Sequence, residues 1–372
     1  MRVAVVSSVD LRTPARFLVQ SLRESGHQVI VISDVSNEFV DVKVSPTFSL
    51  VEVLSSKNFN ADLLVYIEGG TMDIFPLDLN KMECHTVWWG IDSHLNFEKH
   101  LRISKLFDHT FLAQKEFVNQ LNVRGINSAS WLPLAFPTSI QPTTGRTTKF
   151  DFAFVGQTDK LIYPERARIL KLLSTYFPNN FIGTAEPMEM LEIYASSKIV
   201  INQSIKNDIN MRIFEAMGTS ALLVTNEIVE NGFEDLFENG KHLLTFHDDN
   251  HLLEIVNAQL GDENQRISIV RNANELIASK HTYNNRAQEL ISVAQAVKKK
   301  VRFNQFEYAA VLDAMDAIPE ALSLISKSMF SSNSSRRRRV IIIAMTYNLR
   351  LSIFFGRISV KMLEMLKNAR SH

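Results

Sequence analysis

The chain has 372 residues, of which 45% are hydrophobic and 22% charged, the profile of a globular protein with room for two ordinary domains. Lysine plus arginine equals aspartate plus glutamate at 40 each, so the net charge indicates neither a nucleic acid nor an acidic partner. The single cysteine, Cys84, excludes an internal disulfide and a thiolate metal cluster.

The amino-terminal part alternates strand and helix patterns. The β-branched run RVAVVSS is followed by a helical pattern over residues 13–26 and by the strand pattern HQVIVIS. Further strand patterns are ADLLVYIEGG, HTVWWG and HTFLAQ. Strands joined by helices wind into right-handed parallel units. Residues 1–140 are therefore predicted to form a doubly wound, Rossmann-like α/β domain.

A proline-rich stretch, residues 133–149, predicts a linker, which we place at 141–149. The alternation then restarts with the strand patterns FDFAFVG, NFIG, KIVINQ and ALLVTN, separated by helical patterns. Residues 150–298 are predicted to form a second Rossmann-like domain. Two such domains leave a cleft between the carboxyl ends of both sheets, where open α/β sheets bind ligands.

Residues 299–372 are predicted to form a helical basic tail. From Arg336 onward there are nine lysines or arginines and one acid, Glu364, on an otherwise apolar pattern. A basic stripe of this kind suits an anionic membrane or a partner groove, or equally a helix that packs on the other domains. The first apolar run is too short for a signal peptide and no run is long enough for a membrane span. We therefore expect a cytoplasmic protein, with contact to the inner membrane face or a protein through 336–372.

The stretch NDINMRIFEAMGTSALLVTN, residues 207–226, predicts a polar loop, a short helix and a strand. Arg212 lies in the first helical turn, where a cation opposes the helix dipole unless an anion offsets it. Its guanidinium matches phosphate oxygens, and Glu215, one turn on, can accept hydrogen bonds from both ribose hydroxyls. The two residues together would hold a nucleoside diphosphate. The alternative is an i, i+3 ion pair on a surface helix.

The longer run NMRIFEAMGTSALLVTNEIVENGFEDLFENGKHLLTFHDDNHLLEIV resembles the donor half of glycosyltransferases of the GT-B fold, and especially the spore maturation protein CgeB-like family. The segments VWWGIDSH, LFDHTFLAQKEFVNQL, SASWLPLAF, FDFAFVGQ and ASKHTYNNRAQEL are also similar and follow in the family's order, over residues 1–298. The resemblance implies a UDP-linked nucleotide-sugar donor, no essential metal, and hexosyl-type transfer. The acceptor, a glycan, lipid, protein or small molecule, would be held by the first domain.

The resemblance implies seven donor-binding residues: Gly156, Thr158, Lys160, Asn202, Asn210, Arg212 and Glu215. Glu215 would bind ribose, Arg212, Thr158 and Lys160 the phosphates, and the glycine would allow close backbone approach. Two departures from related sequences stand out. Gly218 begins a Gly-Thr-Ser where the family often has Ala-Cys-Gly, and Asn207 replaces the first glutamate of an E-x7-E pattern, with Asp208 beside it.

Asp92 and His94 are the candidate catalytic residues. They follow a strand end in WWGIDSH, at alternate positions, and one of them could take the acceptor's proton. The alternative is that Asp92 caps the next helix and His94 packs locally. Glu68 also ends a strand and is a candidate acceptor contact. We expect the pair of tryptophans before Asp92 to serve the core and His109 to be structural.

Other function classes find less support. The ten histidines show no metalloprotease spacing, so we expect no metal site. A P-loop is absent, and no G-x-G-x-x-G turn follows the first strand, which argues against a dehydrogenase. The predicted function is a metal-independent, nucleotide-sugar-dependent glycosyltransferase that does not bind nucleic acid. The alternatives are a non-catalytic nucleotide-sugar-binding scaffold or sensor, and a nucleotide-sugar epimerase.

Overall fold

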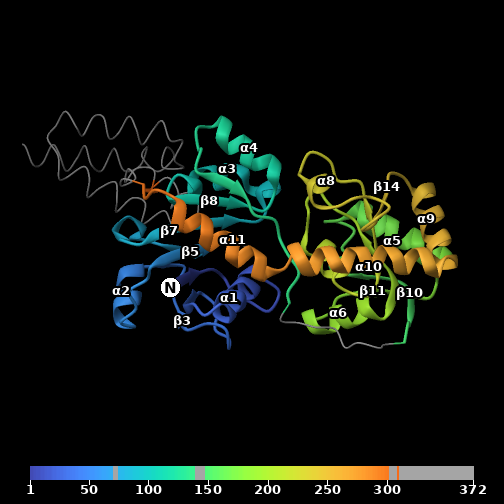
Figure 1. Cartoon of the computed structure of the whole chain (residues 1–372), viewed down its shortest axis with the longest axis horizontal. Coiled ribbons are helices and arrows are strands. Elements are labelled where there is room, and N and C mark those ends of the chain that lie inside the picture. Colours follow the sequence, from blue (N-terminus) through green and yellow to red (C-terminus); the bar gives the residue numbers. More distant parts are fainter. Residues whose placement is uncertain (70–73, 139–146, 301–307, 310–372) are drawn as a thin grey trace, which may run out of the picture.

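The structure is a computed structural model that describes residues 1–69, 74–138, 147–300 and 308–309 (Figure 1). The predicted basic stripe at 336–372 lies outside the described residues, as does most of the linker at 141–149. The described chain forms two α/β domains, each built on a parallel sheet. The predicted fold class is confirmed.

The first sheet has seven parallel strands in the order β3-β2-β1-β5-β7-β8-β9. Their bounds are Val42–Lys43, Gln28–Ser33, Arg2–Val6, Leu63–Ile67, His85–Gly90, His109–Leu112 and Ala129–Trp131. The helices of this domain are α1 (Pro14–Glu24), α2 (Leu50–Ser56), α3 (Ser93–Ser104) and α4 (Lys115–Val123). A separate two-stranded sheet pairs β4 (Thr47–Phe48) with β6 (Phe75–Pro76), and a 3₁₀ turn follows at Leu79–Lys81. Strand β5 is buried along its whole length because helices cover both faces of the sheet.

The second sheet has five parallel strands in the order β11-β10-β12-β13-β14. Their bounds are Asn180–Gly183, Phe150–Val155, Ser197–Asn202, Leu222–Asn226 and Leu244–Phe246. The helices of this half of the chain are α5 (Pro164–Tyr176), α6 (Pro187–Ala195), α7 (Met211–Met217), α8 (Phe233–Leu236), α9 (Asp249–Gly261) and α10 (Glu263–Lys280). Both sheets have central strands whose carboxyl ends carry polar loops.

Helix α11 (Tyr283–Ala296) differs from the prediction, which placed residues up to 298 in the second domain. It packs against α1, where the rings of Phe17 and Tyr283 are 5.3 Å apart, and His85 Nδ1 bonds to the carbonyl oxygen of Ala294 at 2.8 Å. In Figure 1 it continues from α10 back over the first domain. Helical periodicity shows that a helix has a buried face, but not which sheet that face covers.

Within the residues that the structure describes, the chain passes between the domains at 133–138 and again at 281–283, and these two segments are hydrogen-bonded to each other. The backbone N–H of Phe136 donates to His281 (2.8 Å), and that of Tyr283 donates to Phe136 (3.1 Å). Buried Arg286 donates from Nε to the carbonyl oxygen of Pro133 at 2.7 Å. Residues 133–138 of the proline-rich stretch are therefore a packed crossing and not a free linker. One hydrophobic cluster runs through this crossing from the first sheet to the second.

Residues Tyr308 and Ala309 are buried in the core of the first domain, with the Tyr308 ring 5.7 Å from that of Phe75. Trp88 and Trp89 are fully buried, as expected. Every helix in the described part of the chain is too short or too polar to span a lipid bilayer.

Candidate active site

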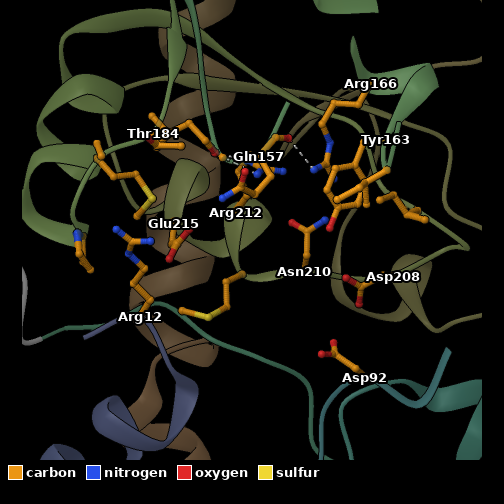
Figure 2. A pocket seen from close by; sticks show the side chains of 18 of the residues that line it. Arg12, Asp92, Gln157, Tyr163, Arg166, Thr184, Asp208, Asn210, Arg212 and Glu215 are labelled. Carbon is orange, nitrogen blue, oxygen red and sulfur yellow. Dashed lines mark hydrogen bonds between the residues drawn. The ribbon is translucent and has the colours of Figure 1, made fainter. Parts of the chain in front are cut away.

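A cavity of about 710 Å³ lies between the carboxyl ends of the two sheets (Figure 2). The first domain contributes Arg12, Phe17, Asp92, His94 and Leu95 to its lining. The second domain contributes the loops after β10, β11 and β12 and the first turns of α7. This is the position where open parallel sheets place their ligands. At the mouth, Arg12 and Glu186 form an ion pair of 2.5 Å between the domains.

Arg212 is held in the cavity by neutral oxygen atoms. Its Nε and Nη2 donate to the carbonyl oxygen of Val155 at 3.1 and 2.9 Å, and its Nη1 donates to Asn202 Oδ1 at 2.8 Å. The guanidinium also lies 4.3 Å from the ring centroid of Phe154. It forms no ion pair with a carboxylate among the described residues, Glu215 included. The surface ion pair considered from the sequence is therefore absent, and the guanidinium is oriented by neutral oxygens without a contact ion pair in the described structure.

A second arginine of the cavity is held in the same way, and it was not predicted from the sequence. Arg166 of α5 is 8% exposed and donates to the carbonyl oxygens of Gln157 (3.1 Å) and Gln203 (3.2 Å). Burial, and then the charge of Arg212, lower the pKa of Arg166 to about 10. Like Arg212, it has no carboxylate partner among the residues described. Two neighbouring cations that repel each other in a buried site favour a bound anion.

Glu215 lies one turn along α7 from Arg212 and is 8% exposed. Burial raises the pKa of its carboxyl to about 7, against the opposing charge of Arg212. The described residues make no hydrogen bond to this carboxylate, although it lines the cavity. A buried acceptor of this kind is open to hydroxyl donors from a ligand.

The remaining predicted donor-binding residues differ in whether they reach the cavity. Asn202 is fully buried and orients Arg212, while its Nδ2 donates to Thr225 on the neighbouring strand at 2.9 Å. Asn210 lines the cavity, and its Oδ1 is buried without a hydrogen-bond partner in the described structure. Thr158 and Lys160 do not line the cavity; their neighbour Gln157 does.

The two glycines singled out from the sequence are closely approached by side chains. Gly156 has φ +148°, and a Cβ there would collide with Nη2 of Arg212. Gly218 ends α7 with φ −83°, so it is not needed for a left-handed turn. A Cβ at Gly218 would collide with the ring of Phe136, at the crossing between the domains.

Asp92 follows β7 and stands at the amino end of α3, but its side chain does not cap that helix. Its carboxyl group lines the cavity instead (Figure 2). Burial, and then the nearby carboxylates of Glu68 and Asp208, raise the pKa of Asp92 to about 7. A carboxylate with this pKa can take up a proton near neutral pH.

Glu68 lies behind the cavity and not on its surface. Its Oε2 accepts hydrogen bonds from the backbone N–H groups of Ile91 (2.5 Å) and Asp92 (2.9 Å), and its Oε1 bonds to His100 Nε2 at 3.1 Å. The residue is 2% exposed. Burial would raise the pKa of Glu68, but His100 and the backbone bonds outweigh it and lower the pKa. Glu68 therefore holds the Asp92 loop and is not placed for direct acceptor contact.

His94 also lines the cavity and is connected to the other domain. Gln114, after β8, bonds through Nε2 to His94 Nδ1 and to Asp208 Oδ1, each at 2.7 Å. Asp208, which stands beside the position of a missing E-x7-E glutamate, lines the cavity, and burial raises its pKa. His109 is structural, as expected: it bonds to Ser130 at 2.8 Å, and burial lowers its pKa to about 4.

The search for metal ligands covers the described residues only. Among them, no three histidine, cysteine, aspartate or glutamate side chains lie together as a metal-binding group.

Residues 139–292, most of the second domain, match the sequence profile of a family described as glycosyl transferase-like. The comparison with curated proteins gives no match. Among solved structures, the chain is similar to HepE from Anabaena in complex with UDP, with 12% identity and a TM-score of 0.59, over 80% of this chain and 100% of the other.

Two further structures agree. A glycosyltransferase from Rickettsia africae has 10% identity and a TM-score of 0.57, over 81% of this chain and 99% of its own. Sucrose-phosphate synthase from Thermosynechococcus elongatus has 13% identity and a TM-score of 0.54, over 80% and 98%. At these identities the likeness shows the fold. The chain has the two-domain GT-B fold, and its second domain matches a glycosyltransferase-like family domain.

Proposed function

We propose that this chain is a glycosyltransferase that transfers a sugar from a nucleotide-diphosphate sugar to an acceptor held by the first domain. The observation that carries the proposal is the pair Arg166 and Arg212. Both guanidinium groups are fixed by neutral oxygens in an interdomain cavity, and neither is paired with a carboxylate in the described structure. A diphosphate is the ligand class that two such forks match.

The order of residues along the cavity indicates how the donor lies. Figure 2 shows Thr184 and Glu215 on one side of Arg212, and Asn210, Asp208 and Asp92 on the other. We place the ribose hydroxyls at Glu215 and the nucleobase beyond them, near Thr184 and the apolar lining residue Met190. The diphosphate then lies at Arg212 and Arg166, and the sugar points toward Asp208 and the first domain.

The reaction follows from this placement. The acceptor hydroxyl attacks the anomeric carbon, the bond from that carbon to the phosphate oxygen breaks, and the nucleoside diphosphate leaves. Arg166 and Arg212 stabilise the negative charge that grows on the leaving oxygens. Asp92 accepts the acceptor's proton. Its pKa of about 7 leaves it largely ionised just above neutral pH.

We further propose that transfer needs no metal ion, because the two guanidinium groups supply the charge compensation that a divalent cation gives to a diphosphate elsewhere. The similar structure from Anabaena contains UDP, which supports a uridine nucleotide. A structure titled alpha-glucosyltransferase in complex with UDP, with 12% identity and a TM-score of 0.57, supports the same choice and a hexose as the transferred sugar. Membership of the CgeB-like family stays part of the proposal and rests on the sequence resemblance.

Titration calorimetry with UDP, GDP and ADP tests donor binding. We expect the wild-type chain to bind one of them, and Arg166→Met to weaken binding about 10- to 100-fold, since charge-assisted bonds contribute about 1.5–3 kcal/mol. Arg168→Met is the matched control. Arg168 lies on the same helix but pairs with Glu165 and Asp249 on the surface, so this variant should bind normally. If the wild-type chain binds no nucleotide, the proposal is wrong.

A second measurement separates an enzyme from a binding protein. The chain is incubated with nucleotide sugars, with and without cell extract as a source of acceptor, and the released nucleoside diphosphate is measured. Release that depends on Asp92 supports transfer. Tight binding without release across the panel favours a nucleotide-sugar-binding scaffold, and conversion of the sugar without release favours an epimerase.

A further inference from the structure

Gln114 joins the candidate catalytic histidine to the opposite domain through three hydrogen bonds. Its side chain is fully buried after β8. The amide oxygen Oε1 accepts from the backbone N–H of His94 at 3.1 Å. The amide nitrogen Nε2 bonds to His94 Nδ1 and to Asp208 Oδ1, each at 2.7 Å. One amide thus contacts His94 twice and Asp208 once.

The orientation of the amide follows from its partners. A glutamine side chain has an accepting oxygen and a nitrogen with two N–H donors. The backbone N–H of His94 is a donor and requires the oxygen, while the carboxylate of Asp208 is an acceptor and requires the nitrogen. A flipped amide would put oxygen against oxygen and N–H against N–H. The second N–H of Nε2 therefore faces His94 Nδ1.

This arrangement decides the tautomer of His94. A ring nitrogen that receives an N–H donor must itself be unprotonated, so the proton of the neutral ring is on Nε2. Nε2 has no hydrogen bond among the described residues, and His94 lines the cavity. It is the ring nitrogen left for a ligand.

We infer that Gln114 is a positioning residue that holds His94 as the Nε2–H tautomer, so that His94 donates a hydrogen bond to an oxygen of the bound substrate. Taking up the acceptor's proton is then the task of Asp92 alone. The two candidate catalytic residues, alike in the sequence pattern, receive different roles. Because Asp208 belongs to the second domain, the full set of bonds forms only when the domains lie as they do here.

The tautomer can be measured without any activity. In the full chain with ¹⁵N-labelled histidine, the His94 ring signals are assigned by their loss in His94→Gln, and their shifts report which nitrogen carries the proton. We expect Nδ1 unprotonated in wild type at pH 8. Gln114→Glu lacks the N–H donor, and its carboxylate next to Nδ1 should move the proton to Nδ1. A proton on Nδ1 in the wild type overturns the inference.

A second variant tests the same inference in case Gln114→Glu does not fold. Gln114→Met keeps the volume but offers neither donor nor acceptor, so the strong preference for Nε2–H should be lost and a mixture of tautomers should appear. If the ring stays entirely in the Nε2–H form in a folded Gln114→Met or Gln114→Glu chain, Gln114 does not set the tautomer, and the inference fails.

The kinetic consequence rests on the proposed glycosyl transfer. Glutamine at residue 94 can place an N–H near the position of Nε2, so His94→Gln should keep kcat within about tenfold of wild type, whereas Asp92→Asn should lose the 10²–10⁴-fold typical of a general base. Loss of activity in His94→Gln equal to that in Asp92→Asn would assign the base role to His94 and overturn the inference. If calorimetry shows no donor binding, the proposed function fails, while the tautomer measurement still decides the role of Gln114.

Discussion

The backbone of Gly156 touches the guanidinium of Arg212: a Cβ atom at residue 156 would collide with Nη2. The glycine was expected to let the backbone approach a ligand, but its space is taken by the arginine that would hold the ligand. Its φ of +148° also lies where side-chain-bearing residues are strained. Glycine at this position therefore leaves room for the guanidinium of Arg212 where it now lies.

Gly156→Ala should displace Arg212 from its bonds with Val155 and Asn202. We expect at least a tenfold loss of nucleoside-diphosphate affinity in calorimetry, because a fixed guanidinium loses less freedom on binding than a displaced one. The control is Gly240→Ala, which shares a positive φ (+83°) but has open space around the added atom. Normal affinity in a folded Gly156→Ala chain would show that Arg212 does not depend on this contact.

Much of the fold follows from sequence, because parallel strands buried on both faces are continuous apolar runs that end in glycine or a polar residue. Those strand ends located Asp92 and Gly156 at the cleft and Asn202 behind it, where it holds Arg212. Side-chain direction was harder to predict. Arg166 is in helical register with the buried residues Ile169, Leu170 and Leu173 of α5, whereas Arg168 lies off this stripe and pairs on the surface. The spacing was therefore a signal that Arg166 is buried, but not that its guanidinium reaches the cavity.

Gln114 shows where a signal was available. It comes two residues after the end of β8, as Asp92 comes two residues after the end of β7, and neighbouring parallel strands bring such residues together at one edge. Its partner Asp208 arrives from the other domain, and no periodicity within one domain predicts a contact between two. The prediction that Glu68 contacts the acceptor fails for a related reason. Glu68 ends a strand, but its carboxylate accepts hydrogen bonds from the backbone of the loop at Ile91 and Asp92.

The charge of Glu68 should set the pH dependence of transfer. Glu68 is one of two carboxylates that, after burial, raise the pKa of Asp92 to about 7. Glu68→Gln keeps an oxygen for the N–H groups of Ile91 and Asp92 but removes the charge. Since the ionised form of Asp92 then meets less repulsion, its pKa should fall. The acidic limb of the profile of kcat/KM against pH should move to lower pH by up to about one unit.

The matched control for this shift is Glu98→Gln. Glu98 is an exposed acid on α3 that pairs with Arg124 at 3.5 Å, outside the cavity. The acidic limb of the pH profile of Glu98→Gln should coincide with that of wild type. Asp208→Asn should move the limb in the same direction as Glu68→Gln, because Asp208 is the other carboxylate that raises the pKa of Asp92. A limb that stays in place in both cavity-side variants would mean that Asp92 is not the titrating base.

Glu215 should cost the protein stability at neutral pH. Burial raises its pKa from 4.5 to about 7, so the folded chain holds this proton more tightly than the unfolded chain does. The free energy of unfolding must then fall as pH rises from about 4.5 to about 7. The difference of 2.5 units corresponds to about 3 kcal/mol, since each unit is 1.36 kcal/mol. Glu215→Gln removes the titration, so its stability advantage over wild type should grow by up to that amount.

Denaturant unfolding at pH 5 and at pH 8 measures the difference in stability between Glu215→Gln and wild type. The control is Glu254→Gln, because Glu254 is an exposed acid on α9, and its stability should follow that of wild type at both pH values. Asp92 titrates in the same range, but it is present in every variant and cancels in the comparison.

The Glu215 carboxylate lowers stability at neutral pH, so we expect it to have a function that glutamine cannot supply. Hydroxyl donors from a ribose would satisfy both of its oxygens, so bound nucleotide should reduce the gap between wild type and Glu215→Gln at pH 8. An unchanged gap, with nucleotide bound, would place the ribose elsewhere in the cavity.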